Sequence, residues 1–185
     1  MIRSLFFIVL FLSTKDSSGQ FTHLIGLGPE LGLPGKNFGE SNLGVGGSLQ
    51  YQLKLNAPVG IQVHVGYVNF VSKTEFFSDM KYKISFLPVR AGILGFIYKD
   101  IIFVSADAGI SKYHANTGTD QTGFSFGFGG GYKYIIAKKH FAQLSVLYNS
   151  HNFQDKQIGQ NFNYNWFSLR LAYGMQWSKQ KETRD

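Results

Sequence analysis

The residue types needed for nucleophilic hydrolysis occur close together near the C-terminal end of the chain, as Ser150, His151 and Asp155. In such an arrangement the histidine takes the proton of the serine hydroxyl, and the acid orients the histidine. However, Ser150 and His151 are adjacent in a stretch with strand character. Their side chains then point to opposite faces and do not readily share a hydrogen bond. We interpret them as polar residues that enter a surface loop.

Four charged residues stand alone among small and polar residues in strand-like segments, namely Glu30, Arg90, Asp107 and Arg170. An unpaired charge is costly to bury, so four charges that share one interior are expected to pair. A two-residue hairpin turn at Tyr98–Lys99 would place Arg90 directly opposite Asp107. Closure of the sheet would bring Arg170 to the depth of Glu30. We expect a charge network that closes the interior.

The remaining polar candidates carry weaker signals. The five histidines are scattered without metal-ligand spacing, and the chain has no cysteine for a thiolate site or a disulfide. We expect Lys54, His64 and Lys133 to be polar residues of the interior. The glycines of segment 127–131 lie in a strand and not between a strand and a helix, which argues against a phosphate loop. The sequence thus predicts no catalytic site, no metal site and no cofactor.

The elements that must position these residues are strands, and segment 43–55 shows their pattern most clearly. Odd-numbered residues such as Leu49 and Tyr51 are apolar, whereas even-numbered residues such as Gln50 and Lys54 are polar. Such alternation is typical of a strand with two different faces. The same pattern recurs in eight segments, which predicts an all-β, eight-stranded, antiparallel up-and-down barrel: 21–33, 43–55, 59–70, 83–97, 101–113, 123–136, 141–150 and 164–177. Connections near 34–42, 71–82, 114–122 and 151–163 are expected to be long polar loops, and the others tight turns.

Alternation alone does not decide which face meets water, since a soluble ligand-binding barrel has its apolar side chains inside. Glycine, however, falls mainly on the polar face, and small residues fit the narrow interior of an eight-stranded barrel. Tyrosine and tryptophan fall near strand ends on the apolar face, as membrane aromatic girdles do. We therefore expect the apolar face to meet lipid, with an aromatic girdle formed by Tyr51, Tyr67, Tyr134, Tyr148, Tyr173 and Trp177.

The N-terminal residues have the layout of a secretory signal peptide. Arg3 precedes an apolar run from Leu5 to Leu12, which is too short to span a bilayer, and small residues follow up to Gly19. We expect a cleaved signal peptide at 1–19, the barrel at 20–177 and a flexible charged tail at 178–185. The net charge of +7 then favours anionic lipid headgroups or sugar phosphates, rather than nucleic acid, as partners of an exported chain.

Several segments carry a resemblance to a known family: ISFLPVRAGI (84–93), ADAGISKY (106–113), GFSFGFGGGYKY (123–134) and FSLRLAYGMQW (167–177). Together with the signal peptide, they resemble the small bacterial outer-membrane β-barrel proteins typified by the membrane domain of OmpA and by OmpX. The resemblance implies short periplasmic turns, longer extracellular loops and both termini in the periplasm. It also implies contact with outer-membrane lipids and lipopolysaccharide. Segment 167–177 is similar to the signal read by the outer-membrane insertion machinery, although eight residues follow Trp177 here.

This family includes adhesins, structural anchors, subunits of envelope complexes and a few lipid-modifying enzymes, so the fold does not fix the function. Our leading interpretation is a non-catalytic outer-membrane barrel with a closed interior, acting in structure or binding or as a subunit of a larger envelope complex. One alternative is a narrow pore. Another is a lipid A deacylase, but the His-x-Ser spacing of those enzymes is absent at Ser150 and His151.

Overall fold

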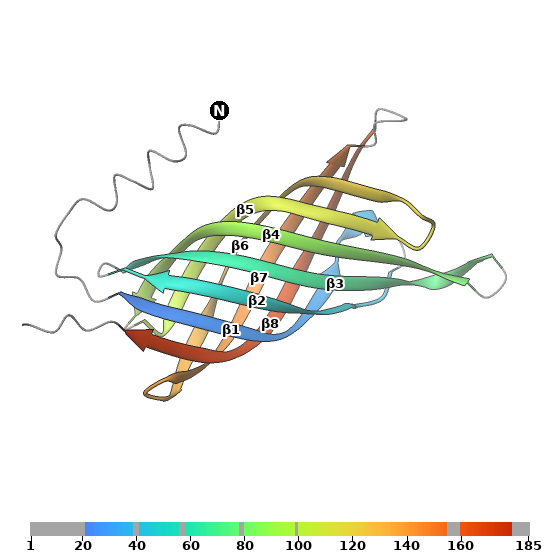
Figure 1. Cartoon of the computed structure of the whole chain (residues 1–185). Helices are drawn as coiled ribbons and strands as arrows, with labels where there is room; N and C mark the ends of the chain where they lie inside the picture. Colours follow the sequence, from blue (N-terminus) through green and yellow to red (C-terminus); the bar gives the residue numbers. More distant parts are fainter. Residues whose placement is uncertain are drawn as a thin grey trace, which may run out of the picture.

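A computed structural model describes residues 21–38, 41–55, 58–77, 80–98, 100–154 and 160–178. Within these ranges eight antiparallel strands form a closed barrel, in which each strand pairs with its sequence neighbours and β8 pairs with β1 (Figure 1). The strands are β1 (Thr22–Pro34), β2 (Gly44–Lys54), β3 (Val59–Phe77), β4 (Met80–Tyr98), β5 (Ile102–Ala115), β6 (Asp120–Ala137), β7 (His140–Gln154) and β8 (Asn161–Ser178). A short 3-10 helix, η1 (Lys36–Phe38), follows β1. The expected signal peptide at 1–19 and residues 179–185 of the expected tail lie outside the described ranges.

The predicted fold class is confirmed: the chain is an eight-stranded antiparallel barrel. We call the end that holds the start of β1 and the end of β8 the terminal end, and the opposite end the loop end (Figure 1). Among the described residues, no helix is long and apolar enough to cross a membrane.

An apolar band encircles the outer surface of the barrel. It includes the outward side chains from Phe167 to Trp177 on β8 and from Leu87 to Ile97 on β4, and large apolar side chains in it remain exposed, with Leu27 66% and Ile93 62% exposed. Each of these two stretches is 11 residues long, close to the 9–11 residues with which a tilted strand crosses a bilayer. Inward side chains at the middle levels of the band are mostly polar, charged or glycine, whereas apolar ones such as Leu94 and Phe96 lie inside nearer the terminal end.

Above the band, towards the loop end, the two faces exchange polarity. On β8 Trp166 is buried inside at 1% exposure, whereas its neighbour Phe167 is 54% exposed outside. On β4 buried Phe86 and exposed Leu87 make the same step. Beyond these pairs the outward residues become polar, as in Asn163 of β8, while the inward ones become aromatic. The loop end is therefore built like a soluble barrel, and the band like a membrane barrel.

This exchange explains why the predicted loop boundaries were wrong. Residues 71–77 and 80–82 of the expected 71–82 loop are strand, as are 151–154 and 161–163 of the expected 151–163 loop. The β3–β4 hairpin consequently projects well beyond the band (Figure 1). Where side chains are described, as in 81–84 and 161–164, the apolar residues lie on the inner face, so a pattern that assumed one apolar face per strand ended too early.

The predicted register of β4 and β5 was also wrong. Arg90 pairs with Gly109, and Asp107 pairs with Gly92, two residues from the predicted pairing. The turn is not the two-residue Tyr98–Lys99 turn: Ile101 N donates a hydrogen bond to Tyr98 O at 2.7 Å, and Asp100 has a left-handed φ of 63°. Lys99 itself lies outside the described residues. The extra turn residues move β5 along β4.

Glycine on the inner face allows close approach of neighbouring strands. A methyl group added at Gly28 would overlap the carbonyl oxygen of Leu171 on β8. One added at Gly46 would overlap the carbonyl oxygen of Tyr67 on β3. Both positions therefore require glycine for backbone packing, in addition to the limited room inside the barrel.

The position of the apolar band predicts where an outward charged side chain destabilises the barrel. Arginine at Leu171, in the middle of the band on β8, is expected to destabilise the barrel by about 2–4 kcal/mol, because it desolvates a charge in hydrocarbon. Arginine at Gln154, an exposed outward residue at the loop end of β7, is the matched control and should change stability by about 0–1 kcal/mol. Denaturant unfolding from phospholipid bilayers measures both values. Equal effects at the two sites would contradict the assignment of the band.

Candidate functional site: the barrel interior

The interior of the barrel is filled by three layers of side chains. An aromatic layer lies at the loop end, a charged and polar layer in the middle, and a smaller apolar layer near the terminal end. Glu30, Arg90, Asp107 and Arg170, which the sequence predicts to share the interior, are all inward-facing and buried, each at 7% exposure or less. They form the middle layer.

Glu30 and Arg170 form one ion pair of this layer, across the seam that closes the barrel. The two residues face each other in the β1–β8 register. Arg170 Nη2 lies 3.1 Å from Glu30 Oε2, and Arg170 Nε donates a hydrogen bond to the same oxygen at 3.2 Å. The second carboxylate oxygen of Glu30 accepts a hydrogen bond from Ser168 Oγ at 2.6 Å. Both oxygens of the buried carboxylate are thereby satisfied.

Arg90 and Asp107 form the second ion pair, diagonally across the β4–β5 ladder. Arg90 Nε lies 3.0 Å from Asp107 Oδ1, and Gln62 Nε2 donates to Asp107 Oδ2 at 2.9 Å. Gly127 leaves room for this pair, since a methyl group there would lie 2.6 Å from Arg90 Nη1. The pairing therefore survives the two-residue difference from the predicted register, because the long arginine side chain reaches the diagonal neighbour.

Two neutral side chains connect the ion pairs. Arg90 Nη2 donates to Asn149 Oδ1 at 2.8 Å, and Asn149 Nδ2 donates to Ser168 Oγ at 2.7 Å. Because Ser168 Oγ in turn donates to Glu30, hydrogen bonds run from Arg90 to Arg170, and the ion pair with Arg90 adds Asp107 to this network. A linked network of this kind fixes the rotamers of its members more firmly than separate pairs do.

The other predicted polar residues lie at two different levels. His64 is buried in the middle layer, 3.9 Å from Glu30 Oε2 and 3.4 Å from Arg90 Nη2. Lys54 and Lys133 lie near the terminal end instead. Lys54 pairs with Asp100 of the β4–β5 turn, and the Lys133 ammonium lies 5.2 Å from the ring centre of Phe96.

Apolar side chains close the terminal end of the interior. Leu94, Phe96 and Phe103 pack together there, and all three are buried. Leu24 and Phe141 are fully buried inward residues of β1 and β7. The ammonium groups of Lys54 and Lys133 lie 5.6 and 5.2 Å from the ring centre of Phe96, so this layer is apolar with charges at its edge.

The aromatic layer at the loop end was not foreseen from the sequence. Its buried members are Phe38, Val68, Phe70, Ile84, Phe86, Tyr113, Ala115, Phe153 and Trp166. Phe86 lies at the centre, with ring centroids 4.9 Å from Trp166 and 5.6 Å from Tyr113. The steps Phe86–Leu87 and Trp166–Phe167, in which two large apolar residues follow each other, are the sequence signal that could have revealed it.

His151 belongs to this layer, which corrects its interpretation as a loop residue. Ser150 and His151 lie within β7, and both are buried. The imidazole stacks on the Trp166 ring at a centroid distance of 4.2 Å. Asp155, the acid of the hydrolytic alternative, lies outside the described residues. Within the described ranges, no three His, Cys, Asp or Glu side chains lie together as metal ligands.

The tyrosines and tryptophan predicted for the girdle lie on the outer surface. Tyr51, Tyr67, Tyr134, Tyr173 and Trp177 are exposed, and Tyr148 is half-buried. Two groups form near the terminal end: His23 stacks on Trp177 and bonds the Tyr51 hydroxyl at 2.7 Å, and His140 bonds the Tyr173 hydroxyl at 2.9 Å. Tyr67 and Tyr148 lie at the upper edge of the apolar band.

Comparison with known proteins relates this geometry to a class. No family model matches the chain, and neither does any curated protein. Among solved structures, Ail, the attachment invasion locus protein of Yersinia pestis, is 14% identical with a TM-score of 0.50, over 86% of this chain and 99% of that chain. Neisserial surface protein A is 17% identical with a TM-score of 0.47, over 86% and 96%. Outer membrane protein W of E. coli is 13% identical with a TM-score of 0.46, over 88% and 100%. The likeness to Ail shows that the chain has the fold of the small outer-membrane β-barrels.

The ion pair at the closing seam gives a prediction for stability. Replacing Arg170 by methionine leaves the Glu30 carboxylate buried and unpaired, and is expected to destabilise the barrel by about 3–5 kcal/mol. Replacing both Glu30 and Arg170 by methionine removes both charges and should recover a large part of that loss. Denaturant unfolding in bilayers measures the cycle. A double variant that loses as much as the two single variants together would show that the residues act independently.

Proposed function

We propose that the protein is a non-catalytic, integral outer-membrane barrel with an interior closed to solutes. It serves a structural or binding role at the cell surface, or acts as a subunit of a larger envelope assembly. Its partners are outer-membrane lipids and lipopolysaccharide around the barrel, the outer-membrane insertion machinery during assembly, and, as a complex subunit, other envelope proteins. Residues 1–19 direct export and are removed.

The apolar band supports the membrane location. Side chains such as Leu27, Ile93 and Leu171 expose a continuous apolar surface around the barrel. Soluble monomeric proteins rarely expose an apolar surface of this extent to water. Aromatic residues border the band on both sides, as they do at the headgroup regions of membranes. The short connections β2–β3, β4–β5 and β6–β7 lie at the terminal end, with the start of β1 and the end of β8, so we assign that end to the periplasm and the loop end to the exterior.

The single observation that carries the closed interior is its filling at three successive levels. Phe86, Arg90 and Phe96, all inward residues of β4, belong to the loop-end, middle and terminal layers respectively, and each is at most 7% exposed. An eight-stranded barrel has an interior just wide enough for side chains to fill. A solute that crossed the barrel would have to displace the packed side chains of the loop-end and terminal layers and the charge network of the middle layer.

The narrow pore and the deacylase receive less support. A conducting path needs a continuous polar or wet route, but the polar middle layer lies between two apolar layers. For hydrolysis, Ser150 and His151 are adjacent on β7, and the imidazole stacks on Trp166 inside the barrel. This geometry holds the histidine in the aromatic layer and not beside the serine hydroxyl.

Planar-bilayer conductance tests the proposal. The purified protein is expected to give no stable current steps. A triple variant, Phe86→Ala, Arg90→Ala and Phe96→Ala, removes one filling side chain from each layer and should conduct if it inserts. The matched control removes three outward side chains of the same strand, Leu87, Val89 and Ile97, by substitution to alanine, and should stay silent.

The outcome is decided by the unmodified protein. Steady conductance of the wild type at neutral pH would overturn the closed interior. If the triple variant fails to insert, the three single variants give the same comparison one layer at a time, and each is expected to remain closed because two layers persist.

A further inference from the structure

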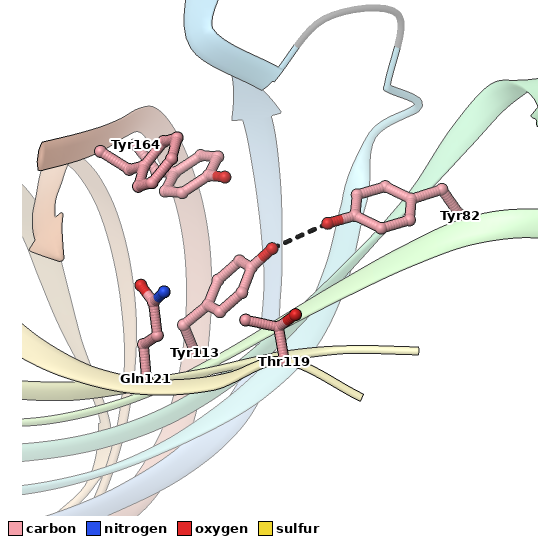
Figure 2. Close-up of a pocket in the computed structure, with 6 residues that line it drawn as sticks. Tyr82, Tyr113, Thr119, Gln121 and Tyr164 are labelled. Carbon is pink, nitrogen blue, oxygen red and sulfur yellow. Dashed lines mark hydrogen bonds between the residues drawn. The ribbon is translucent and has the colours of Figure 1, made fainter. Parts of the chain in front are cut away.

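The mouth of the barrel at the loop end contains a pocket of about 220 Å³. Its lining comes from four strands and one turn: Tyr82, Tyr113, Thr119, Gln121, Phe162 and Tyr164 (Figure 2). Tyr113 is buried at the floor, Thr119 is exposed at the rim, and the other four are half-buried. The pocket thus opens to the medium and ends on the aromatic layer.

The floor of the pocket is rigid. The Tyr113 and Tyr164 rings stack with centroids 5.6 Å apart and an interplanar angle of 16°. Beneath them Tyr113 packs against Phe86 and Phe153, and Tyr164 packs against Phe38. The Tyr82 and Tyr113 hydroxyls meet at 2.8 Å across the pocket (Figure 2). A site held in place before binding loses little entropy when a ligand arrives.

All six lining side chains are uncharged, although charged residues are close by along the chain. Asp120, between Thr119 and Gln121, turns to the outer surface and pairs there with His114 and with Lys112 at 3.1 Å. The hydrogen bond with His114, together with that from Lys112, holds the pKa of Asp120 below its usual range. Its charge therefore stays outside the pocket, occupied by its own partners.

The lining combines two kinds of group. The faces of tyrosine and phenylalanine rings are electron-rich and attract the weakly positive C–H groups of a saturated ring. Phenol, threonine and amide groups both donate and accept hydrogen bonds, which suits a ligand that carries several hydroxyls. The volume lies below the roughly 300–1,000 Å³ of pockets for drug-sized ligands, so it admits one ring and not a chain.

We propose that this pocket binds one uncharged pyranose unit of a glycan. The ring packs on the aromatic side chains, and its hydroxyls bond with Gln121, Thr119 and the tyrosine hydroxyls. The inference rests on the proposed function in one respect: the loop end must face the cell exterior for the pocket to meet glycans. The sugar comes either from the polysaccharide of lipopolysaccharide in the same membrane or from a free glycan of the surroundings.

Saturation-transfer NMR on the full-length mature protein in phospholipid micelles tests the pocket. The probes are the methyl pyranosides of glucose, galactose, mannose and N-acetylglucosamine, and at least one is expected to receive saturation. Tyr164→Phe and Gln121→Ala should each weaken that affinity about fivefold, the loss expected for one hydrogen bond. The control Tyr134→Phe changes an exposed tyrosine of the apolar band and should leave affinity unchanged.

A second arm separates the two sources. Lipid-free polysaccharide from the producing bacterium either displaces the bound pyranoside, which assigns the pocket to lipopolysaccharide, or fails to displace it, which assigns it to an external glycan. Thr119→Ala, at the exposed rim, gives a further variant if a core substitution prevents folding. The proposal is overturned if no pyranoside binds, or if affinity is equal in all variants. Since binding is measured on purified protein, its failure leaves the conductance result untouched.

Discussion

Where β4, β7 and β8 leave the apolar band, the medium outside the barrel changes from hydrocarbon to water. An outward apolar side chain is favourable on one side of that level and unfavourable on the other, while a charge behaves in the opposite way. The backbone continues as strand through the boundary, because each strand must keep its ladder hydrogen bonds with both neighbours. Only the side chains adapt. Buried Trp166 beside exposed Phe167 marks the level on β8, and Phe86 beside Leu87 marks it on β4.

The interior follows from this change outside. At the middle levels of the band the large apolar side chains point to the surface, and the inner face holds mainly glycine, serine, amides and the four charges. In a narrow interior such charges are costly unless they are paired, and the Asp107–Arg90–Asn149–Ser168–Glu30–Arg170 network pairs all four. Above the band the aromatic residues turn inward and pack as a core. The step from the polar middle layer to the aromatic layer therefore follows from the change of medium outside the barrel.

Much of this architecture follows from the sequence. Period-two alternation predicts eight strands and their two faces, because burial on either side leaves a direct mark on residue type. The meeting of Glu30 with Arg170 follows from closure of the ring alone. The Arg90–Asp107 register did not follow, because it depends on a turn in which Asp100 adopts a left-handed conformation that its residue type only permits. A turn that is two residues longer shifts the residue pairs between β4 and β5 by two positions.

The loop end was the largest gap in the sequence-based prediction, for a physical reason. Its strands alternate as clearly as those of the band, as Lys81, Tyr82, Lys83 and Ile84 illustrate, but with the apolar residues on the other face. An argument that fixes one apolar face per strand reads this change of phase as the end of the strand. The pocket is harder still, since Tyr82, Tyr113 and Tyr164 come from three strands whose alignment depends on register.

The band and the loop end differ in the surfaces that they leave available for binding a ligand. In the band, the inward charged side chains pair with one another and fill the interior, and the large outward apolar side chains form the surface that we assign to lipid. Above the band the outer surface is polar, and the inner surface ends in tyrosines that pack on the aromatic layer and border the pocket at the mouth. A core needs no row of phenol hydroxyls at its upper edge, because phenylalanine would pack as well without a polar group to satisfy. The Tyr82 and Tyr113 hydroxyls bond each other at this edge, and the pocket that they border is where we propose that the barrel binds a polar ligand.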